Sequence, residues 1–288
     1  HRFVDHWDQV PTERGRDTLA TLNAAAAGQV DVLVLLGADL LADVPDRDLA
    51  RRALDGAGMV VAVDLFTTPT AARADVVLPA AAPTEVDGSF TNLEGRVSVV
   101  SRKVTPPGTS RPDWMVAAEL ADRLGTDLGF ASTDDVWTEL AAVSVIHAGL
   151  SPEALVAHTR EGLLIAGGSE LERPAPTDVA GRDAYGLRLV ASRSMYDTGV
   201  LVGHSPSLAG LAPGTRAALE PTDLARYGVA EGEVVDLIGP KGTVQVAVTA
   251  DDGVAKGTVH LYVNQPNVDV CEIVDAALPV TEVRVGRR

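Results

Sequence analysis

Short aliphatic runs recur at intervals in the first third of the chain. Residues 31–36 (DVLVLL) and 59–63 (MVVAV) are apolar almost throughout, which is typical of strands buried on both faces of a parallel sheet. Residues 76–78 predict a third strand that Pro79 ends, because proline removes a donor from the hydrogen-bond ladder. We therefore expect three strands in this part of the chain, of which the first two are buried.

The segments between these strands predict helices. Residues 18–27 are alanine-rich and follow Asp17, a residue type that caps helix N-termini. A second helix is predicted over residues 47–54 and a short one over residues 67–74. Strands that alternate with helices through short connections predict an α/β domain with a parallel sheet and helices on both faces.

Ligands of such domains bind beyond the carboxyl ends of the parallel strands. Residues 37–39, 64–68 and 79–85 follow the three predicted strands and are expected at that edge of the sheet. The pattern leaves two interpretations open for these segments: a ligand site or ordinary polar loops.

The middle of the chain predicts more helices and then a boundary. The helices are expected at residues 111–124, at residues 134–147 with Ser132 or Thr133 as cap, and at residues 152–160 after Ser151. Residues 166–186 are rich in glycine, proline and polar side chains, which is typical of a linker. We therefore expect one domain over residues 1–165 and another over residues 187–288.

The periodicity changes after this linker. Short β-branched stretches follow one another, and the segment from Gly239 to Gly242 is expected to join two of them as a hairpin. Several short strands in succession predict a small closed barrel. The strands are expected at residues 187–191, 233–238, 243–249, 257–263 and 283–285.

Composition narrows the classes of partner. The chain has 24 basic and 40 acidic side chains, a formal net charge of −16, and such a surface repels phosphate backbones, so we expect no nucleic-acid partner. Hydrophobic residues make up 46% and aromatic residues only 4%, so the core is expected to consist of Ala, Val and Leu. No apolar run approaches the roughly 18 residues that span a bilayer, so no direct membrane insertion is expected.

Cys271 is the single cysteine, so no disulfide can form within the chain and no cysteine-rich metal cluster can be built from it alone. Its apolar surroundings favour a packed core residue over a nucleophile, and a reducing, cytoplasmic setting is expected. The six histidines are scattered without metal-ligand spacing, so we predict no metal ligand and no catalytic residue. Because the chain begins at His1 without a signal peptide, we expect a fragment that lacks an upstream part.

Two longer stretches stand out. Residues 74–96 (ADVVLPAAAPTEVDGSFTNLEGR) place polar side chains in a loop that Gly88 and Gly95 allow to bend tightly. This loop is expected either to hold a ligand or to bond to itself, with Arg96 pairing Glu85 or Glu94. Residues 221–235 (PTDLARYGVAEGEVV) predict a helical turn capped by Thr222 and ended by Gly228, followed by a turn at Gly232.

These two stretches resemble molybdopterin-dependent oxidoreductases, the group of formate dehydrogenases and nitrate reductases. The first resembles the signature of that family, and the second resembles its C-terminal dinucleotide-binding domain. The resemblance covers about residues 30–110 and 185–288. It implies an α/β fold in which a Rossmann-like parallel-sheet domain is followed by a double-psi β-barrel domain.

One subgroup of this family is different in kind. The sequence of residues 31–58 and 111–125 most resembles the large iron–sulfur subunit (the G subunit) of bacterial, actinobacterial-like NADH-quinone oxidoreductase. In that subunit the molybdenum site is generally lost and the fold serves as a scaffold. The resemblance implies a non-catalytic segment of respiratory complex I, a complex that transfers electrons from NADH to quinone and translocates protons.

The same resemblance implies the surroundings of the segment. Its 4Fe-4S clusters would lie in an N-terminal part absent from this sequence, and the segment itself would bind no cofactor. Its partners would be other hydrophilic-arm subunits of the complex. Its location would be cytoplasmic, peripheral to the inner face of the plasma membrane.

Catalytic members of the family carry an Arg-x-x-x-His-x-x-Thr-Gly-like segment that contacts the pterin. Residues 193–199 (RSMYDTG) match it and keep Arg193, Thr198 and Gly199, but Asp197 adds a negative charge. A carboxylate beside a pyrophosphate-bearing cofactor is unfavourable because like charges repel. This departure weakens the cofactor-binding interpretation and favours the scaffold.

Two alternatives to the scaffold stay open. A catalytic molybdopterin-dependent oxidoreductase, such as a formate dehydrogenase, would bind molybdopterin guanine dinucleotide. The resemblance implies that the contacts would then be Asp64, Thr67, Glu85, Asn92, Arg193, Thr198, Gly199 and Asn267. A free-standing interaction module is the third hypothesis.

Overall fold

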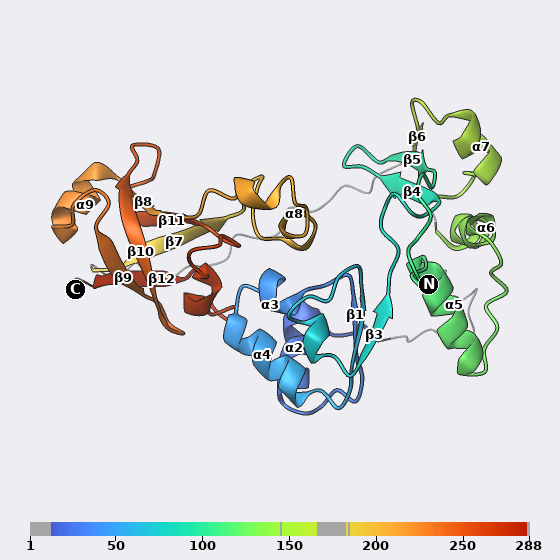
Figure 1. Cartoon of the computed structure of the whole chain (residues 1–288), viewed down its shortest axis with the longest axis horizontal. Helices are drawn as coiled ribbons and strands as arrows, with labels where there is room; N and C mark the ends of the chain where they lie inside the picture. The colour runs from blue at the N-terminus through green and yellow to red at the C-terminus, as the bar shows by residue number, and fades with distance from the viewer. Residues whose placement is uncertain (1–12, 145, 166–182, 184, 287–288) are drawn as a thin grey trace. The chain divides into compact units, whose positions relative to one another are not determined.

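The computed structural model describes residues 13–144, 146–165, 183 and 185–286 (Figure 1). They divide into two compact units. One contains residues 17–61, 66–75, 183 and 185–286, and the other contains residues 13–16, 62–65, 76–144 and 146–165. Most of the expected linker lies outside the described residues, and the domain boundaries at 165 and 187 stay a prediction.

Three strands form the predicted sheet in the order β1–β2–β3: β1 (Leu33–Leu36), β2 (Val60–Asp64) and β3 (Val76–Pro79). The amide of Asp75 donates to the Val60 carbonyl at 2.9 Å, and the amide of Ala80 donates to the Asp64 carbonyl at 3.0 Å. Residue numbers rise together along both strands, as in a parallel ladder. The prediction of a parallel sheet is therefore confirmed.

The burial of these strands differs from the prediction. Leu33 and Leu35 of β1 are buried, but Val34 and Leu36 are 52% and 66% exposed, and both valines of β3 are also exposed. Only β2 is buried along most of its length. The expectation of a buried strand is thus wrong for one face of β1, because an apolar run does not reveal whether a second layer covers it.

Helices cover the buried face of β1. They are α2 (Thr18–Ala26), α3 (Leu40–Asp43) and α4 (Arg47–Gly56). Asp17 caps α2 as predicted, since its Oδ1 accepts from the Ala20 amide at 2.8 Å. Leu22 of α2 and Leu49 of α4 pack with Leu35 in one buried cluster.

The short helix predicted at residues 67–74 is wrong in extent, because only a 3-10 turn, η1 (Ala71–Arg73), forms there. Pro69 precedes it and has no amide to donate to a helical ladder. The hydroxyl of Thr68 accepts from the Ala71 amide at 3.1 Å. The segment is therefore held by side-chain contacts.

The unit that contains residues 76–165 has its own small sheet. It is antiparallel, in the order β4 (Gly88–Thr91), β5 (Arg96–Val100) and β6 (Leu163–Leu164). The last part of the expected loop, from Gly88 to Arg96, therefore belongs to a β-hairpin, a strand pairing that the sequence did not predict. Gly95 takes a φ of 76° in its turn.

Three helices follow in this unit: α5 (Asp113–Arg123), α6 (Thr133–Val143) and α7 (Pro152–Ala157). Ser132 is the cap of α6 and forms a capping box with Asp135, so Ser132 rather than Thr133 has that role. Helix α6 ends before the predicted His147 because Ser144 turns to an extended backbone and its hydroxyl contacts the His147 ring at 2.7 Å. Helix α7 likewise stops before the predicted Arg160.

Six strands close into a barrel in the order β10–β8–β11–β7–β12–β9 (Figure 1). They are β7 (Leu187–Ser192), β8 (Ala217–Leu219), β9 (Val234–Ile238), β10 (Thr243–Ala250), β11 (Thr258–Tyr262) and β12 (Glu282–Gly286). Short helices connect them: α8 (Val200–Gly203), η2 (Ala209–Leu211), α9 (Pro221–Tyr227) and η3 (Val270–Ile273). The predicted fold, a Rossmann-like sheet followed by a double-psi β-barrel, is confirmed.

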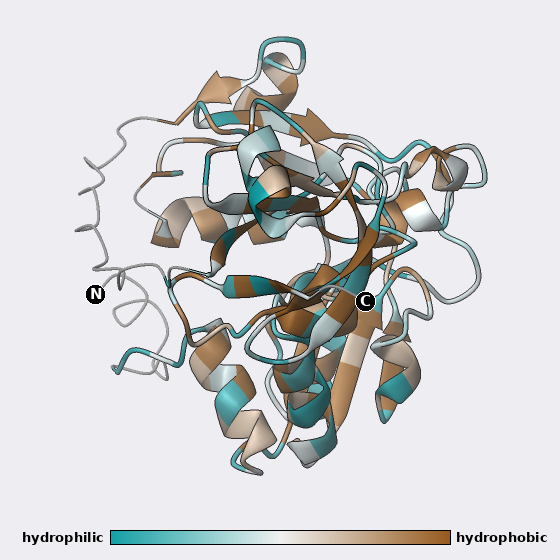
Figure 2. Cartoon of the chain, turned by 90° about the vertical axis from the view of Figure 1, so that its left-hand side faces the viewer, coloured by the Kyte–Doolittle hydropathy of each residue, from teal (hydrophilic) through white to brown (hydrophobic). Residues whose placement is uncertain are grey.

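Alternating side chains fill the barrel. Val244, Val246 and Val248 of β10 are buried, whereas the residues between them are more exposed. Figure 2 colours the ribbon by hydropathy and shows hydrophobic segments, in brown, along its strands. Leu237 and Leu261 are fully buried in the same core. Branched aliphatic side chains thus supply the core, as the low aromatic content predicts.

The loops of the barrel agree with the sequence except at one cap. Gly239 donates to the Gly242 carbonyl at 2.9 Å and closes the predicted hairpin. Gly228 ends α9 in the left-handed region, at a φ of 64°. The predicted cap Thr222 is wrong, because the Glu220 carboxylate accepts from the Thr222 and Asp223 amides instead.

Ion pairs join α4 to η3 and to the β9–β10 hairpin inside one unit. Arg47, only 5% exposed, donates to Asp269 from Nε at 2.9 Å and from Nη2 at 3.1 Å. Burial lowers the pKa of Arg47, but the hydrogen bond and charge of Asp269 outweigh that effect and hold the pKa above its ordinary value. Lys241 lies 3.6 Å from the buried carboxylate of Asp46. No helix among the described residues is long and apolar enough to cross a membrane.

Removing one charge of the buried pair is predicted to destabilise the fold. Asp269→Asn keeps an acceptor for the Cys271 amide but leaves the buried Arg47 charge without its carboxylate. We expect a loss of about 2 kcal/mol in the free energy of unfolding by urea, below the usual range for a buried pair because Asp269 is 41% exposed.

Arg52→Ala is the control, because its pair with Asp48 is a surface pair within α4. It is expected to change the same free energy by less than about 0.5 kcal/mol. Equal effects of the two variants would mean that the Arg47–Asp269 pair does not hold α4 to the barrel.

Candidate functional site

Parallel pairing of β7 with β11 brings two distant loops together. Ser192 lies opposite Tyr262, and the Val263 amide donates to the Ser192 carbonyl at 2.9 Å. Both strands therefore end at the same edge of the barrel. The Arg193–Gly199 segment leaves β7 there, and the Asn264 loop leaves β11 beside it.

The two loops are bonded to each other. The amide and the hydroxyl of Thr198 both donate to the Asn264 carbonyl, at 2.8 and 3.0 Å. Asn264 takes a φ of 53°, the one positive φ of a non-glycine residue in the described part of the chain. A left-handed asparagine is tolerated because its short polar side chain finds local partners. The predicted residues Arg193, Thr198 and Gly199 thus share one constrained corner.

A cavity of about 300 Å³ opens at this corner. One wall comes from the loop at the end of α3 and the other from the barrel. Its lining includes Asp43, Pro45, Leu189, Arg193, Asn264 and Cys271. Arg193 is the cation of this lining, so its state decides which ligands the cavity suits.

The side chain of Arg193 is 55% exposed, and its guanidinium has partners from its own chain on one side. Its Nε and Nη2 both lie 2.9 Å from Oδ2 of Asp197. Its Nη1 lies 3.8 Å from a carboxylate oxygen of Asp43. In the amide orientation that satisfies both neighbours, Asn264 accepts from Nη2 at 3.2 Å and donates to the Ala42 carbonyl at 2.9 Å. Arg193 thereby braces the two barrel loops against α3.

Gly199 is fitted to this ion pair. A Cβ at Gly199 would lie 2.8 Å from Oδ1 of Asp197 and 2.9 Å from Nη2 of Arg193. The Gly199 amide also donates to that Oδ1 at 2.8 Å. The glycine of the predicted Thr-Gly pair is therefore explained by packing within the chain.

Asn267, the last predicted contact, lies in the barrel and is bonded to a neighbouring loop. Its Oδ1 accepts from the Thr215 amide at 2.8 Å, and its Nδ2 donates to the Thr215 carbonyl at 2.9 Å. Both amide atoms thus have a protein partner. Gln265, which the sequence did not single out, links the same loop to the Arg193 segment through the Gly214 amide and the Ser194 hydroxyl.

The other predicted contacts are spread over both units. Thr67 is exposed, and Asp64 accepts from the amide of the next residue at 2.7 Å. Glu85 and Asn92 belong to the unit of residues 76–165. Asn92 accepts from the Glu94 and Arg96 amides in the β4–β5 turn, and Arg96 lies 3.4 Å from Glu94. The turn is therefore bonded to itself, with Glu94 as the partner of Arg96, and a ligand-holding role of this loop stays a prediction.

A buried polar pair behind β1 is missing from the predictions. Thr70 donates to Oδ1 of Asp39 at 2.5 Å and accepts from the Leu41 amide at 3.0 Å, and both residues are almost fully buried. Asp39 directly follows the first predicted strand, so the sequence could have singled it out. Thr70 could not be recognised from the sequence, because its partner is 31 residues away.

Cys271 lines the cavity but is inert. Burial raises the pKa of its thiol to about 11, and its side chain is 5% exposed. The prediction of a packed core cysteine is confirmed. A thiol in this state is neither a good nucleophile nor a ready metal ligand.

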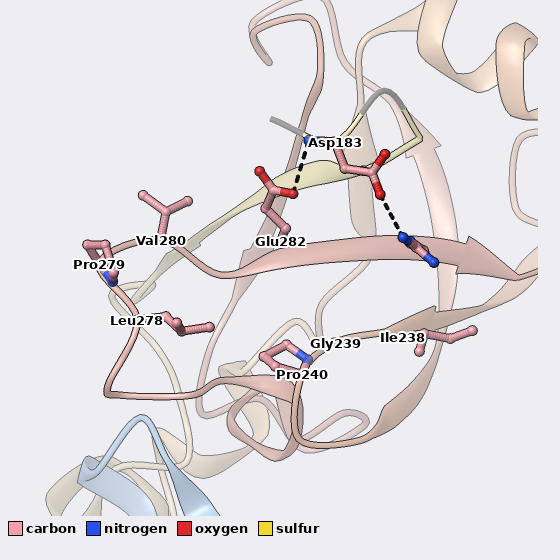
Figure 3. Close-up of a pocket in the computed structure, with 10 residues that line it drawn as sticks. Asp183, Ile238, Gly239, Pro240, Leu278, Pro279, Val280 and Glu282 are labelled. Carbon is pink, nitrogen blue, oxygen red and sulfur yellow. Dashed lines mark hydrogen bonds and ion pairs between the residues drawn. The ribbon is translucent and has the colours of Figure 1, made fainter. Parts of the chain in front are cut away.

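A larger cavity of about 500 Å³ lies elsewhere on the barrel (Figure 3). Ile238, Pro240 and Leu278 supply apolar walls. Its charged groups pair with each other, since Arg284 lies 2.6 Å from Asp183 and Glu282 accepts from the Asp183 amide at 3.3 Å. None of the predicted contacts lines it, so we place the candidate site at Arg193.

Two family models match the chain. The model for molybdopterin oxidoreductases matches residues 8–123, and the model for the molybdopterin dinucleotide-binding domain matches residues 187–283. The chain belongs to the molybdopterin oxidoreductase family. The two matches agree with the order of the α/β part and the barrel.

Individual relatives have different activities in their names. The NADH-quinone oxidoreductase G subunit of Streptomyces coelicolor is 34% identical over 96% of this chain and 31% of that protein. An F420-dependent formate dehydrogenase 2 subunit alpha of Methanococcus maripaludis is 31% identical over 82% of this chain and 38% of that protein. The chain thus spans about a third of each. The solved acetylene hydratase of Pelobacter acetylenicus shares the fold, with a TM-score of 0.67, 18% identity and coverage of 85% of this chain and 39% of that one.

Membership of this family implies a pterin dinucleotide, whose pyrophosphate needs uncompensated donors. The corner at Arg193 does not fit such a group. Its cation is already paired with Asp197 and faces Asp43, and the Gly199 amide already donates to Asp197. A further anion would meet the carboxylates of Asp197 and Asp43 beside one guanidinium, so the charges of these three side chains sum to −1 and do not favour it. The cofactor-contact roles of the predicted residues stay a prediction.

Gly199→Ala is predicted to destabilise the chain by disturbing this ion pair. The backbone φ of Gly199 is −58°, which alanine adopts readily, so the expected cost of about 1–2 kcal/mol comes from the close Cβ contacts alone. Gly210→Ala is the control, because nothing lies within 4 Å of its Cβ position. Chemical unfolding should show a change of less than about 0.5 kcal/mol for the control, and equal losses would refute the packing role of Gly199.

The buried thiol is predicted to react slowly. With the pKa of Cys271 raised from 9.0 to about 11, its thiolate fraction near neutral pH is about 100-fold lower than that of the ordinary group. Labelling by Ellman's reagent should therefore be at least that much slower in the native chain than in urea. Rapid labelling of native protein would show that the cavity exposes a reactive thiolate.

Proposed function

We propose that this chain is a scaffold segment of the large iron–sulfur subunit of an NADH-quinone oxidoreductase. In this proposal the segment transfers no electrons and binds no pterin. It packs against the rest of its own polypeptide and against other hydrophilic-arm subunits of the complex. The complex would lie on the cytoplasmic side of the plasma membrane and would carry its 4Fe-4S clusters outside this segment.

The observation that carries the proposal is the state of Arg193. The residue that would face the cofactor in a catalytic relative is neutralised by Asp197 and braced by Asn264. Paired in this way, it stabilises the fold instead of recruiting an anion. The similarity to the NADH-quinone oxidoreductase protein of Streptomyces coelicolor over 96% of the chain supports the same proposal.

A second candidate function is a catalytic molybdopterin-dependent oxidoreductase such as a formate dehydrogenase. It is favoured by the 31% identity to the Methanococcus maripaludis formate dehydrogenase subunit and by the match to the dinucleotide-binding domain. Under this alternative, Asp64, Thr67, Glu85 and Asn92 would join Arg193, Thr198, Gly199 and Asn267 around the cofactor. Asp197 would then have to move away from Arg193 when the cofactor binds.

Activity of the native complex distinguishes the two functions. We expect the full polypeptide, purified with its natural partners through an affinity tag, to support quinone reduction by NADH. We expect no reduction of a viologen dye by formate in the same preparation. Formate-dependent dye reduction without NADH–quinone activity would reverse the order of the two candidates.

The preparation needs a control for assembly. A variant with a change outside the cavity lining, Arg52→Ala on the surface of α4, should give the same NADH–quinone activity per assembled complex as the unchanged chain. Asp269→Asn should reduce the amount of assembled complex, because it loosens α4 from the barrel. Loss of activity per assembled complex in Arg52→Ala, which keeps the fold, would contradict a scaffold role for this segment.

A further inference from the structure

We propose that Asp197 is a built-in anion that occupies a latent anion-binding position of this chain. The position is defined by the guanidinium of Arg193 and the main-chain amide of Gly199. Without Asp197, it would take a phosphate-type oxygen. The inference rests on the proposed function in one respect, namely that the corner holds no pterin dinucleotide in the native complex.

The geometry of the carboxylate is that of a bound oxyanion. Oδ2 of Asp197 accepts a hydrogen bond from Nε of Arg193 and forms an ion pair with its Nη2, both at 2.9 Å, and Oδ1 accepts from the Gly199 amide at 2.8 Å. A guanidinium together with a main-chain amide is the donor set that proteins use for phosphate and carboxylate ligands. Asp197 is only 5% exposed, so it fills the position and keeps solvent anions out.

The surroundings are fitted to a carboxylate of the chain. The Cβ of any residue other than glycine at position 199 would lie within 3 Å of both members of the pair. The pair is also tethered locally, because Asp197 follows Arg193 by four residues and the amide of Thr198 is held by Asn264. The internal anion therefore has a high effective concentration, which a free ligand must exceed in order to displace it.

In the same unit, an aromatic side chain is also paired with another side chain of this chain. The ring of Phe66, in the loop after β2, stacks on the imidazole of His204 at the end of α8, with centroids 4.0 Å apart and an interplanar angle of 14°. His204 is held in turn by the Val200 carbonyl at 2.8 Å. The ring of Phe66 is thus covered by a side chain that follows α8.

The test uses inorganic pyrophosphate as the probe and the full chain as the receptor. Asp197→Ala removes the internal anion and leaves both donors in place. Asp43→Ala is the matched control, because it removes the other carboxylate near Arg193 but leaves the Gly199 amide occupied. Binding is measured by isothermal titration calorimetry and by the ³¹P line width of pyrophosphate.

We expect Asp197→Ala to bind pyrophosphate at least about tenfold more tightly than the unchanged chain, because one adjacent negative charge is removed and two donors are freed. Asp43→Ala should gain clearly less, and the double variant Arg193→Gln/Asp197→Ala should lose the gain. If Asp197→Ala does not fold, Asp197→Asn keeps the shape of the side chain without its charge and is expected to gain at least about threefold.

Two results would overturn the inference. One is an unchanged chain that binds pyrophosphate as tightly as the Asp197 variants, since the position would then already be open. The other is a folded Asp197 variant that gains no binding. Neither result depends on the proposed function, which fails instead if the native complex turns over formate and not NADH.

Discussion

The ion pair between Arg193 and Asp197 is the interaction on which the account of this chain depends. It forms where β7 and β11, paired in parallel, release two loops at one edge of the barrel. Asn264 and Asp43 reach the same guanidinium, so a barrel loop, its neighbour and α3 are held by one side chain. At this edge of the barrel, the guanidinium of Arg193 and the amide of Gly199 are thereby paired with a carboxylate of the same chain, Asp197.

The ion pairs behind this corner have a related role. Arg47 and Lys241 tie α4 and the barrel together through Asp269 and Asp46, and two of these four groups, Arg47 and Asp46, are buried. Buried charges specify geometry because each loses much more when its partner moves than an exposed charge does. The walls of the Arg193 cavity are therefore positioned by electrostatic contacts as well as by the aliphatic clusters on either side of it.

The sequence predicted the elements well where a local pattern determines them. Aliphatic runs located β1 and β2, and Asp17, Ser151 and Gly228 marked helix ends through side-chain caps or a left-handed backbone that need no distant partner. The exposed faces of β1 and β3 were not predictable, because apolar strands look alike whether one or two layers cover them. Strand β8 was missed because three residues carry no measurable alternation.

The residues of the candidate site were likewise predictable only where they lie close together in the sequence. Arg193, Thr198 and Gly199 were found because they lie close together in a family-like segment, and the sequence also flagged Asp197 as an unfavourable charge. Asp43 and Asn264 were not recognised as partners of Arg193, since the contacts join residues far apart in the sequence. Long-range ion pairs and hydrogen bonds depend on the closed barrel, and no local pattern encodes them.

The central claim is that this family corner holds no pterin dinucleotide, and the metal and pterin content of the intact parent polypeptide tests it most directly. Molybdenum and tungsten are measured by elemental analysis, and pterin by the fluorescence of its oxidised form, on the same sample. We expect the polypeptide to contain iron without stoichiometric molybdenum, tungsten or pterin. Near-stoichiometric metal together with pterin would contradict it, and would mean that Asp197 gives way to a cofactor at Arg193.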